Sequence, residues 1–266
     1  MAAARDGDVM NRALARACVG LTAGILAFGA AGCTREPPAT QQSDFFPLHT
    51  EDTWVYEVAQ PLRNLSTRMT VRVRGERYIQ TLGRRCRLVD ESYADADAAV
   101  GMLSGGAAGP EVYPVAYCRE NGFLYRALSL EYRGSELREV GLGSSEERFL
   151  PDGLSSALNW DSVTTAYDLG GGNGYGVRQM HHAVAEADVV DVPAGHFAGC
   201  VRVDTVALHG GRHNGTYEAA PIVLYYTDWY APNVGLVRTV QSDRPDRGAP
   251  LAKIELLAYD VEGGRR

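Results

Sequence analysis

Apolar and polar residues alternate with a period of two through most of the chain after residue 45. Trp54, Tyr56 and Val58 occupy every second position, and the segment MTVRV at 69–73 repeats the pattern with Thr and Arg between its apolar residues. Successive side chains of a strand point to opposite faces, so this alternation predicts strands with one buried face and one wet face. The candidate strands are residues 54–58, 69–73, 76–82, 85–93, 112–119, 124–132, 175–187, 197–208, 216–230, 235–242 and 252–261.

Short turns, rather than amphipathic helices, separate these candidate strands. Strands joined in this way pair antiparallel, and a sheet of this size must curve to bury one face. We therefore expect an all-β fold, a large curved antiparallel sheet or partly closed barrel of about ten to eleven strands, with at most one or two short helices. The one weak helix signal is at residues 151–160, and the Ala/Gly-rich stretch 94–109 is expected to be a loop.

Two turns connect strands in the second half of the chain. The sequence VPAGHF at 192–197 sets Pro193 and Gly195 between two extended runs, and WYAPNVGLV at 229–237 sets Pro232 and Gly235 between an aromatic run and the next strand. Proline fixes its own φ, and glycine adopts positive φ at little cost. We expect both glycines to take such conformations, and Phe197 to enter the core in register with the rest of its strand.

The first 32 residues predict an export signal. An apolar run at 17–30 follows Arg12 and Arg16, and at about 14 residues it is shorter than the roughly 20 that a membrane-spanning helix needs. The run ends in AAGC, which resembles the bacterial lipobox, whose Cys is lipidated and becomes the mature N-terminus. Cys33 is thus the expected lipidation site. Ala30 replaces the usual Leu, so cleavage as an ordinary secreted protein stays open.

The predicted organisation is a lipoprotein signal peptide at 1–32, a flexible tether at 33–45 and a single β domain at 46–266. Pro, Thr and Gln without apolar periodicity fill the start of the tether. Thr34 stands where well-studied enterobacterial lipoproteins carry Asp when they stay in the inner membrane. By that resemblance we expect a cell-envelope protein, anchored by acyl chains such as palmitate in the outer membrane and facing the periplasm. Met1 and Met10 both remain open as the start.

Net charge argues against nucleic acid as a partner. The chain carries 26 Lys and Arg against 33 Asp and Glu, a net charge of −7. The predicted signal holds three Arg and two Asp, so the remainder is at −8. The sequence contains no Lys/Arg stripe with interleaved aromatic residues, which is the usual footprint of nucleic-acid binding.

Three cysteines follow the predicted anchor, in a compartment where disulfides form. Cys86 and Cys118 lie in extended segments that neighbouring strands could bring together, so they are the predicted disulfide. Cys200 is expected to be a small buried apolar residue.

No motif in the sequence predicts catalysis, a cofactor or a metal site. The glycine-rich stretch 170–176 lacks the dinucleotide-binding spacing, no nucleophile elbow or HExxH occurs, and no Cys/His spacing suggests zinc. His181 and His182 are expected to point to opposite faces of one strand. The competing hypothesis is an envelope hydrolase that uses scattered histidines and carboxylates. Its candidate carboxylates are Asp152, Asp161, Asp228 and Glu255.

Aromatic residues are the remaining candidates for a ligand site. The chain has 14 Tyr and 3 Trp, which by default belong to a β core or to strand edges. A curved sheet can also hold an apolar ligand or lipid on its concave face, as closed barrels do. On that hypothesis the candidate lining residues are Trp54, Tyr56, Tyr226 and Trp229.

The order of these motifs resembles a group of uncharacterised bacterial lipoproteins. FPLHTEDTWVY at 46–56 is similar to their opening FPL, spacer and WxY, and VPAGHF, CVRV and WYAPNVGLV are similar to their closing half. The likeness covers most of 46–259 outside 94–109, and it departs at Thr50, Glu51 and Asp52, where the group has a glycine. It implies a curved β-sheet with a distant, fold-level similarity to envelope lipoprotein carriers, and it brings no catalytic residues.

We therefore predict a non-catalytic cell-envelope lipoprotein that acts as a binding or structural module. Its predicted partners are the membrane, through the N-terminal lipid, and an apolar ligand or an envelope protein. Neither nucleic acid nor a cofactor is expected.

Overall fold

The structure, a computed structural model, describes residues 43–94, 112–127, 130–139, 146–155, 157–167, 174–213, 216–217 and 221–262. Cys33, the predicted signal at 1–32 and most of the predicted tether lie outside these residues, as does nearly all of the stretch 94–109. The described residues belong to one compact unit. None of the helices within them has the length and apolar character needed to cross a membrane.

Fifteen strands and one 3-10 turn make up the described chain. The 3-10 turn η1 is Pro61–Arg63. The strands are β1 (Thr53–Gln60), β2 (Leu65–Ile79), β3 (Arg84–Tyr93), β4 (Val112–Glu120), β5 (Phe123–Ala127), β6 (Leu130–Arg133), β7 (Glu136–Glu139), β8 (Glu146–Pro151), β9 (Asn159–Tyr167), β10 (Gly174–Val192), β11 (Gly195–His213), β12 (Thr216–Tyr217), β13 (Ile222–Ala231), β14 (Gly235–Ser242) and β15 (Ala252–Asp260).

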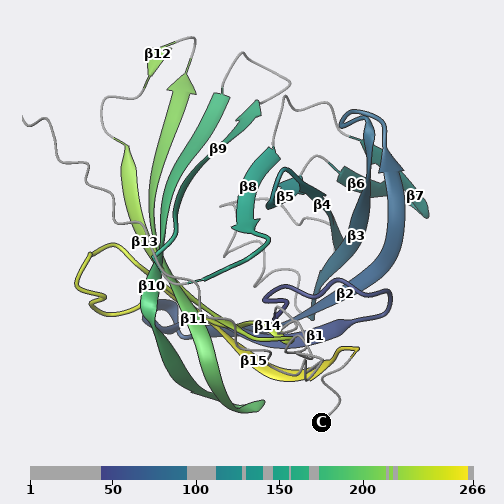
Figure 1. Cartoon of the computed structure of the whole chain (residues 1–266). Coiled ribbons are helices and arrows are strands. Elements are labelled where there is room, and N and C mark those ends of the chain that lie inside the picture. Colours follow the sequence, from purple (N-terminus) through teal and green to yellow (C-terminus); the bar gives the residue numbers. More distant parts are fainter. Residues whose placement is uncertain are drawn as a thin grey trace, which may run out of the picture. The chain divides into compact units, whose positions relative to one another are not determined.

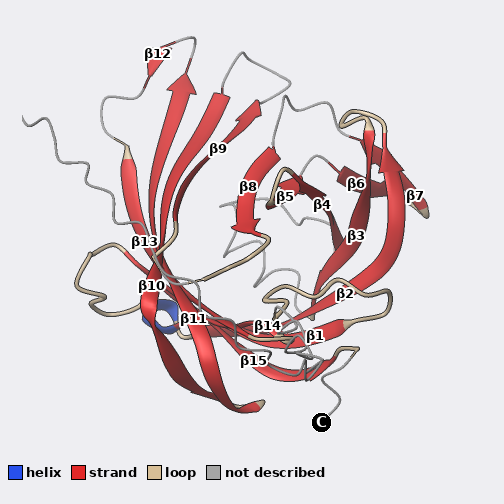
Figure 2. Ribbon diagram, viewed as in Figure 1, coloured by secondary structure: helices blue, strands red, loops and turns tan. Residues whose placement is uncertain are grey.

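Thirteen of these strands form one antiparallel sheet in the order β8-β5-β4-β3-β2-β1-β15-β14-β13-β11-β10-β9, with β12 paired to β11. The first strand pairs with the last, from Thr53 opposite Asp260 to Ala59 opposite Lys253, and this pairing joins the two halves of the sheet. The sheet curls until its end strands β8 and β9 approach each other without pairing (Figure 1). The prediction of an all-β, partly closed antiparallel sheet is confirmed (Figure 2).

Three expectations are wrong in detail. The large sheet contains thirteen strands rather than about ten or eleven, because short polar strands such as β8 show no clear alternation. The described part of 151–160 forms no helix, since β8 ends at Pro151, β9 begins at Asn159, and Ala157 between them has a φ of +67°, outside the α-helical region. The expected strand 216–230 is split into β12 and β13.

The curved sheet carries an apolar cluster on each face. The larger cluster lies on the inner, concave face and joins strands from distant places in the sheet order, with Phe149 of β8 packed against Tyr230 of β13 at 6.5 Å between ring centroids. Val89 belongs to this inner cluster, whereas its neighbour Leu88 belongs to the smaller one. The smaller cluster therefore lies on the outer face, where Leu137 of the β6–β7 hairpin covers it.

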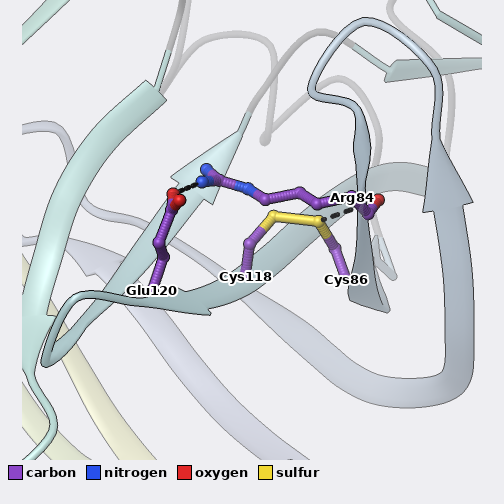
Figure 3. The surroundings of a disulfide bond; sticks show 4 residues. All are labelled: Arg84, Cys86, Cys118 and Glu120. Atoms are coloured by element: carbon purple, nitrogen blue, oxygen red, sulfur yellow. Dashed lines mark hydrogen bonds and ion pairs between the residues drawn. A yellow bond between two sulfur atoms is a disulfide. The ribbon is translucent and has the colours of Figure 1, made fainter.

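A disulfide joins Cys86 on β3 to Cys118 on β4 inside the outer cluster (Figure 3). The two residues continue the β3–β4 register directly, and their Cα atoms are 4.4 Å apart, a separation typical of narrow antiparallel pairs. Beside the disulfide, Arg84 and Glu120 form an ion pair across the same two strands (Figure 3). This is the cysteine pair that the sequence predicts, and Cys200 is a buried free thiol.

The two predicted turns lead directly from one strand to the next. Val192 pairs with Gly195 at the β10–β11 turn, and Ala231 pairs with Gly235 at the β13–β14 turn. Both glycines have positive φ, as the sequence predicts, with +140° at Gly195 and +103° at Gly235.

A bulge interrupts the register that was expected to continue unbroken after the first turn. Val190 pairs with Phe197, but the next pair is Asp188 with Cys200, so β11 holds one extra residue between them. Gly199, with a φ of +73°, lies within this bulge. Phe197 is buried as predicted, although the alternation does not run unbroken from it into the rest of β11.

Candidate functional site

Polar and charged side chains gather on one part of the inner face. Asp228 lies two positions from the buried Tyr230 on β13, and Glu91 lies two positions from Val89 on β3, so both share the face of the inner apolar cluster. Strand pairing extends the set across the sheet, because paired residues face the same way. We call these eight residues the inner polar cluster: Glu91, Arg126, Glu147, Ser162, Gln179, His181, Thr205 and Asp228.

Arg126 is the cation of this cluster. It lies opposite Tyr117 on β4 and opposite Glu147 on β8. Its Nη atoms are 3.5 Å from the Glu91 carboxylate and 4.0 Å from that of Glu147. Burial favours a lower pKa for Arg126, but Tyr117, Glu91 and Glu147 outweigh burial, so the pKa is raised overall. The guanidinium therefore stays charged and links β3, β5 and β8.

Arg126 keeps contact with solvent although it lies on the inner face. Its side chain is 28% exposed, and that of Glu91 is 17% exposed. Tyr93, Tyr226 and Asp228 on the same face are half-buried rather than buried. Solvent thus reaches the inner polar cluster within the curve of the sheet.

A chain of hydrogen bonds crosses β11, β10 and β9 and ends on β8. Thr205 Oγ1 lies 2.8 Å from His181 Nδ1, and His181 Nε2 lies 3.1 Å from Ser162 Oγ. Ser162 Oγ donates to Gln179 Oε1 at 2.9 Å, and the Gln179 side chain is hydrogen-bonded to Glu147. Because β8 and β9 do not pair, this side-chain contact bridges the gap between the two ends of the sheet.

The direction of these bonds follows from Gln179. Its Oε1 accepts a hydrogen bond from Ser162, so its NH2 group faces the Glu147 carboxylate. Burial raises the pKa of Glu147, and the hydrogen bond from Gln179 counteracts that rise. Ser162 can then accept the Nε2 proton of His181, whose Nδ1 accepts from Thr205. In this arrangement His181 does not take the Ser162 proton, the step that a catalytic serine requires. Burial also lowers the pKa of His181 to about 4, and Ser162 is 4% exposed.

Asp228 differs from the other carboxylates of the cluster, because no cation faces it among the described residues. Its Oδ1 accepts a hydrogen bond of 2.7 Å from Thr239 Oγ1 on β14. Burial raises the pKa of Asp228 to about 7, opposed by the Thr239 hydrogen bond and assisted by the carboxylates of Glu147 and Asp204. A carboxyl group enclosed without a counter-charge costs stability, so its presence calls for a reason other than packing.

Trp54 and Tyr56, two of the predicted lining residues, lie in the apolar part of the inner face. Both are buried. Trp54 Nε1 donates to the carbonyl of Val234 at 2.6 Å, and the Tyr56 hydroxyl donates to that of Leu236 at 3.0 Å. The two side chains therefore fasten β1 to the β13–β14 turn.

Tyr226 and Trp229, the other two predicted lining residues, face opposite sides of β13. Tyr226 lies opposite Thr205 on the inner face, and its hydroxyl accepts from Gln241 Nε2 at 3.2 Å. Trp229 points to the other side of β13, where its Nε1 donates to Asp188 at 2.8 Å. Of the four predicted lining residues, the structure brings Tyr226 alone to the inner polar cluster.

The carboxylates and histidines named for a hydrolase are not gathered in one place. Asp152 and Asp161 are exposed and paired with arginines, and Glu255 belongs to an ion-pair group on the outer face. Asp228 is the one candidate carboxylate in the inner polar cluster. Of the two adjacent histidines, His181 is buried and the next is exposed, in line with their expected opposite orientations.

Sequence reasoning missed Glu91, Arg126 and Glu147. Glu91 lies two positions after Val89 and therefore faces inward, and Arg126 lies two positions after Leu124 in a run that otherwise has apolar residues at every second position. A charged residue at an inward position is the signal that could have revealed an internal polar site. Glu147 lies in a strand without clear alternation, so the sequence offers no such signal for it.

No protein-family model matches this chain, and no curated protein matches it. Two solved structures share its fold. A candidate lipoprotein from Parabacteroides distasonis ATCC 8503 gives a TM-score of 0.54 at 17% sequence identity, over 82% of this chain and 99% of that chain. A candidate exported protein with a YmcC-like fold from Bacteroides fragilis NCTC 9343 gives 0.51 at 15% identity, over 82% and 99%. At these identities the likeness establishes the fold alone, and the motif resemblance stays a prediction.

Proposed function

We propose that this chain is a non-catalytic, lipid-anchored protein of the cell envelope that binds a small amphipathic ligand inside its curved sheet. The observation that carries the proposal is the inner polar cluster, where Arg126 and Glu91 keep solvent contact although the sheet encloses them. Protein cores are normally close-packed, whereas ligand sites combine apolar walls with a few convergent polar groups. The inner face combines these two parts.

Several observations support a place in the envelope. The expected signal at 1–32 and the expected lipidation of Cys33 favour export and anchoring, and Thr34 favours the outer membrane, facing the periplasm. The two structures that share the fold are described as a candidate lipoprotein and a candidate exported protein, which fits the same location. A structural role beside another envelope protein is the alternative if the interior takes no ligand.

The proposal is tested with the mature chain, residues 33–266, carrying Cys33→Ser so that it stays in solution. Titration with the neutral apolar fluorophore N-phenyl-1-naphthylamine should give a saturable, one-to-one rise in fluorescence. Gln241→Phe on the inner face of β14 should weaken this binding about tenfold, because it fills space beside Tyr226.

Val240→Phe is the matched control for that variant. Val240 lies opposite Thr227 on the outward side of the same strand, so its substitution should leave binding unchanged. Unmutated protein that shows no saturable rise, or equal binding by the two variants, would contradict a ligand site inside the sheet.

One observation favours the competing hypothesis of an envelope hydrolase, the contact between Ser162 and His181. An activated serine reacts with fluorophosphonate probes, whereas a serine whose proton is donated to Gln179 should not. We expect that the probe does not react with Ser162, so that any labelling of the folded chain is the same in the Ser162→Ala variant. Labelling at Ser162 would favour the hydrolase instead.

A further inference from the structure

Charge on the inner face is unbalanced. The inner polar cluster contains three carboxyl groups, Glu91, Glu147 and Asp228, and one guanidinium, Arg126. Arg126 contacts Glu91 and Glu147. Asp228 has a hydrogen bond from Thr239, and the charged groups that act on it most strongly are carboxylates. The cluster therefore carries an excess of negative charge, which one more cation beside Asp228 would balance.

Aromatic rings lie near this position. Tyr230 lies two positions from Asp228 on the same face of β13, and burial, Asp228, Tyr117 and Glu147 all raise the pKa of its hydroxyl. The Phe149 ring lies 5.6 Å from that of Tyr117 and 6.5 Å from that of Tyr230, between centroids. Carboxylates combined with aromatic faces form the usual protein environment for an ammonium group.

A buried donor on the same face gives a second and independent sign of a ligand. Trp160 on β9 is 5% exposed and stacks on His181 at 4.8 Å between ring centroids. Its Nε1 has no hydrogen-bond partner in the described part of the chain. A buried N–H group without an acceptor is costly, so the site calls for an acceptor atom that the described residues do not supply.

We propose that Asp228 and Glu147 bind the ammonium group of an amphipathic ligand, and that Trp160 Nε1 donates a hydrogen bond to an oxygen of the same molecule. This inference rests on the proposed function and names the chemistry of its ligand. The apolar body of the ligand lies against Tyr117, Phe149 and Tyr230. An anionic headgroup would instead meet two carboxylates in an enclosed site, where like charges repel strongly.

Three amphiphiles with the same twelve-carbon chain test this inference below their micellar concentrations. Dodecyltrimethylammonium is cationic, dodecyldimethylamine oxide is neutral at pH 7.5 and similar in shape, and dodecanoate is anionic. Calorimetry on the mature chain should show that the cationic amphiphile binds at least about tenfold more tightly than the neutral one. Dodecanoate should bind most weakly.

Asp228→Asn is the decisive variant, because asparagine keeps the shape and the acceptor for Thr239 while it removes the charge. This variant should bind the cationic and the neutral amphiphile about equally, so that the preference is lost. Asp191→Asn is the matched control, since Asp191 is exposed and pairs with His196 near the β10–β11 turn. That variant should keep the full preference.

The outcomes separate the two proposals. Equal binding of the three amphiphiles by the unmutated chain, or an unchanged cationic preference in Asp228→Asn, overturns the ammonium site and leaves the proposed binding function standing. Absence of binding by all three, together with a negative result for the neutral fluorophore, overturns the proposed function and this inference with it.

Discussion

The two turn glycines adopt similar backbone conformations in different surroundings. A Cβ atom built on Gly235 would lie 3.6 Å from Trp54 Nε1 and 3.7 Å from Pro47 Cδ. A Cβ atom on Gly195 would meet nothing within 4 Å. Backbone strain at positive φ therefore acts at both positions, and crowding by a larger side chain acts at Gly235 alone.

Gly235→Val should accordingly destabilise the domain more than Gly195→Val, and each should cost about 1 to 3 kcal/mol or more. Gly210→Val is the control in the described chain, because Gly210 has no positive φ and open space where its Cβ would lie. Gly171, in the glycine-rich stretch 170–176, lies outside the described residues. Urea midpoints measure the three variants. Equal midpoints would mean that neither turn depends on its glycine.

Asp228 should make stability depend on pH. Its pKa is raised from 3.8 to about 7, so the folded chain holds a proton that the unfolded chain releases between these values. Ionisation of this group therefore does not reduce the free energy of unfolding below pH 4. It reduces that free energy progressively as the pH rises toward 7, and the loss is constant above pH 7. Asp228→Asn removes this loss, so the free energy of unfolding of the variant should exceed that of the unmutated chain by up to about 4 kcal/mol at pH 8.

The measurement is the difference in urea unfolding free energy between variant and unmutated chain at pH 4, 6 and 8. Asp161→Asn, an exposed carboxylate paired with Arg178, serves as control and should show no such growth. A difference for Asp228→Asn that stays flat across this range would show that the carboxyl ionises as easily in the folded chain as in the unfolded one.

At the level of strands, the sequence predicted what alternation and turn residues determine locally. The strand at 235–242 was expected with the bounds that β14 has, and both hairpin turns were placed correctly. Errors arose where alternation fails. β10 and β11 are each 19 residues long and contain bulges, so each spans more than one period-two run. In β8 a charged residue, Glu147, faces inward, and β7 is a four-residue strand of a short hairpin. Neither strand shows an apolar alternation that would predict it.

The disulfide is an element-scale constraint, since it fixes the far ends of β3 and β4 under the β6–β7 hairpin. Cys86→Ala with Cys118→Ala removes a cross-link between residues 32 apart in sequence. On the chain-entropy model this should destabilise the domain by about 3 to 4 kcal/mol. Urea midpoints before and after reduction of the unmutated chain give the same quantity independently.

Cys200 provides the internal control for that experiment. Burial raises the pKa of its thiol to about 11, so it should resist alkylation in the folded chain and react after unfolding. Non-reducing peptide mapping should yield the Cys86–Cys118 pair and a free Cys200. A peptide pair that contains Cys200 would refute this assignment.

For the whole molecule, the sequence could indicate curvature but not how the two halves of the sheet join. They join because β1 pairs with β15, a contact between strands about 200 residues apart that no local pattern encodes. The inner polar cluster is of the same kind, since its eight residues come from seven strands and meet only after the sheet curls. Prediction therefore reached the fold class and two turns, and it named two residues of the site, Asp228 and His181, without their partners.

The attachment of the domain to the membrane is the remaining whole-molecule question. The described chain begins at Ser43. The next residue, Asp44, is held in place by a hydrogen bond from the Asn233 N–H to its carbonyl and by an ion pair with Arg119. Nine residues lie between Cys33 and Ser43, so ten residue-to-residue steps join them. A chain of that length spans at most about 36 Å, so a lipid on Cys33 would keep the domain within that distance of the bilayer surface.

Cys33→Ser should move the protein from the membrane fraction to the soluble fraction and abolish its labelling by a palmitate analogue. The physical reason is that acyl chains on Cys33 would be the anchor, since a covalent chain contributes about 0.8 kcal/mol per buried methylene. Cys200→Ser is the control and should remain in the membrane fraction and labelled. If the unmutated protein is soluble and unlabelled, the chain is instead exported by cleavage near residue 32 without a lipid.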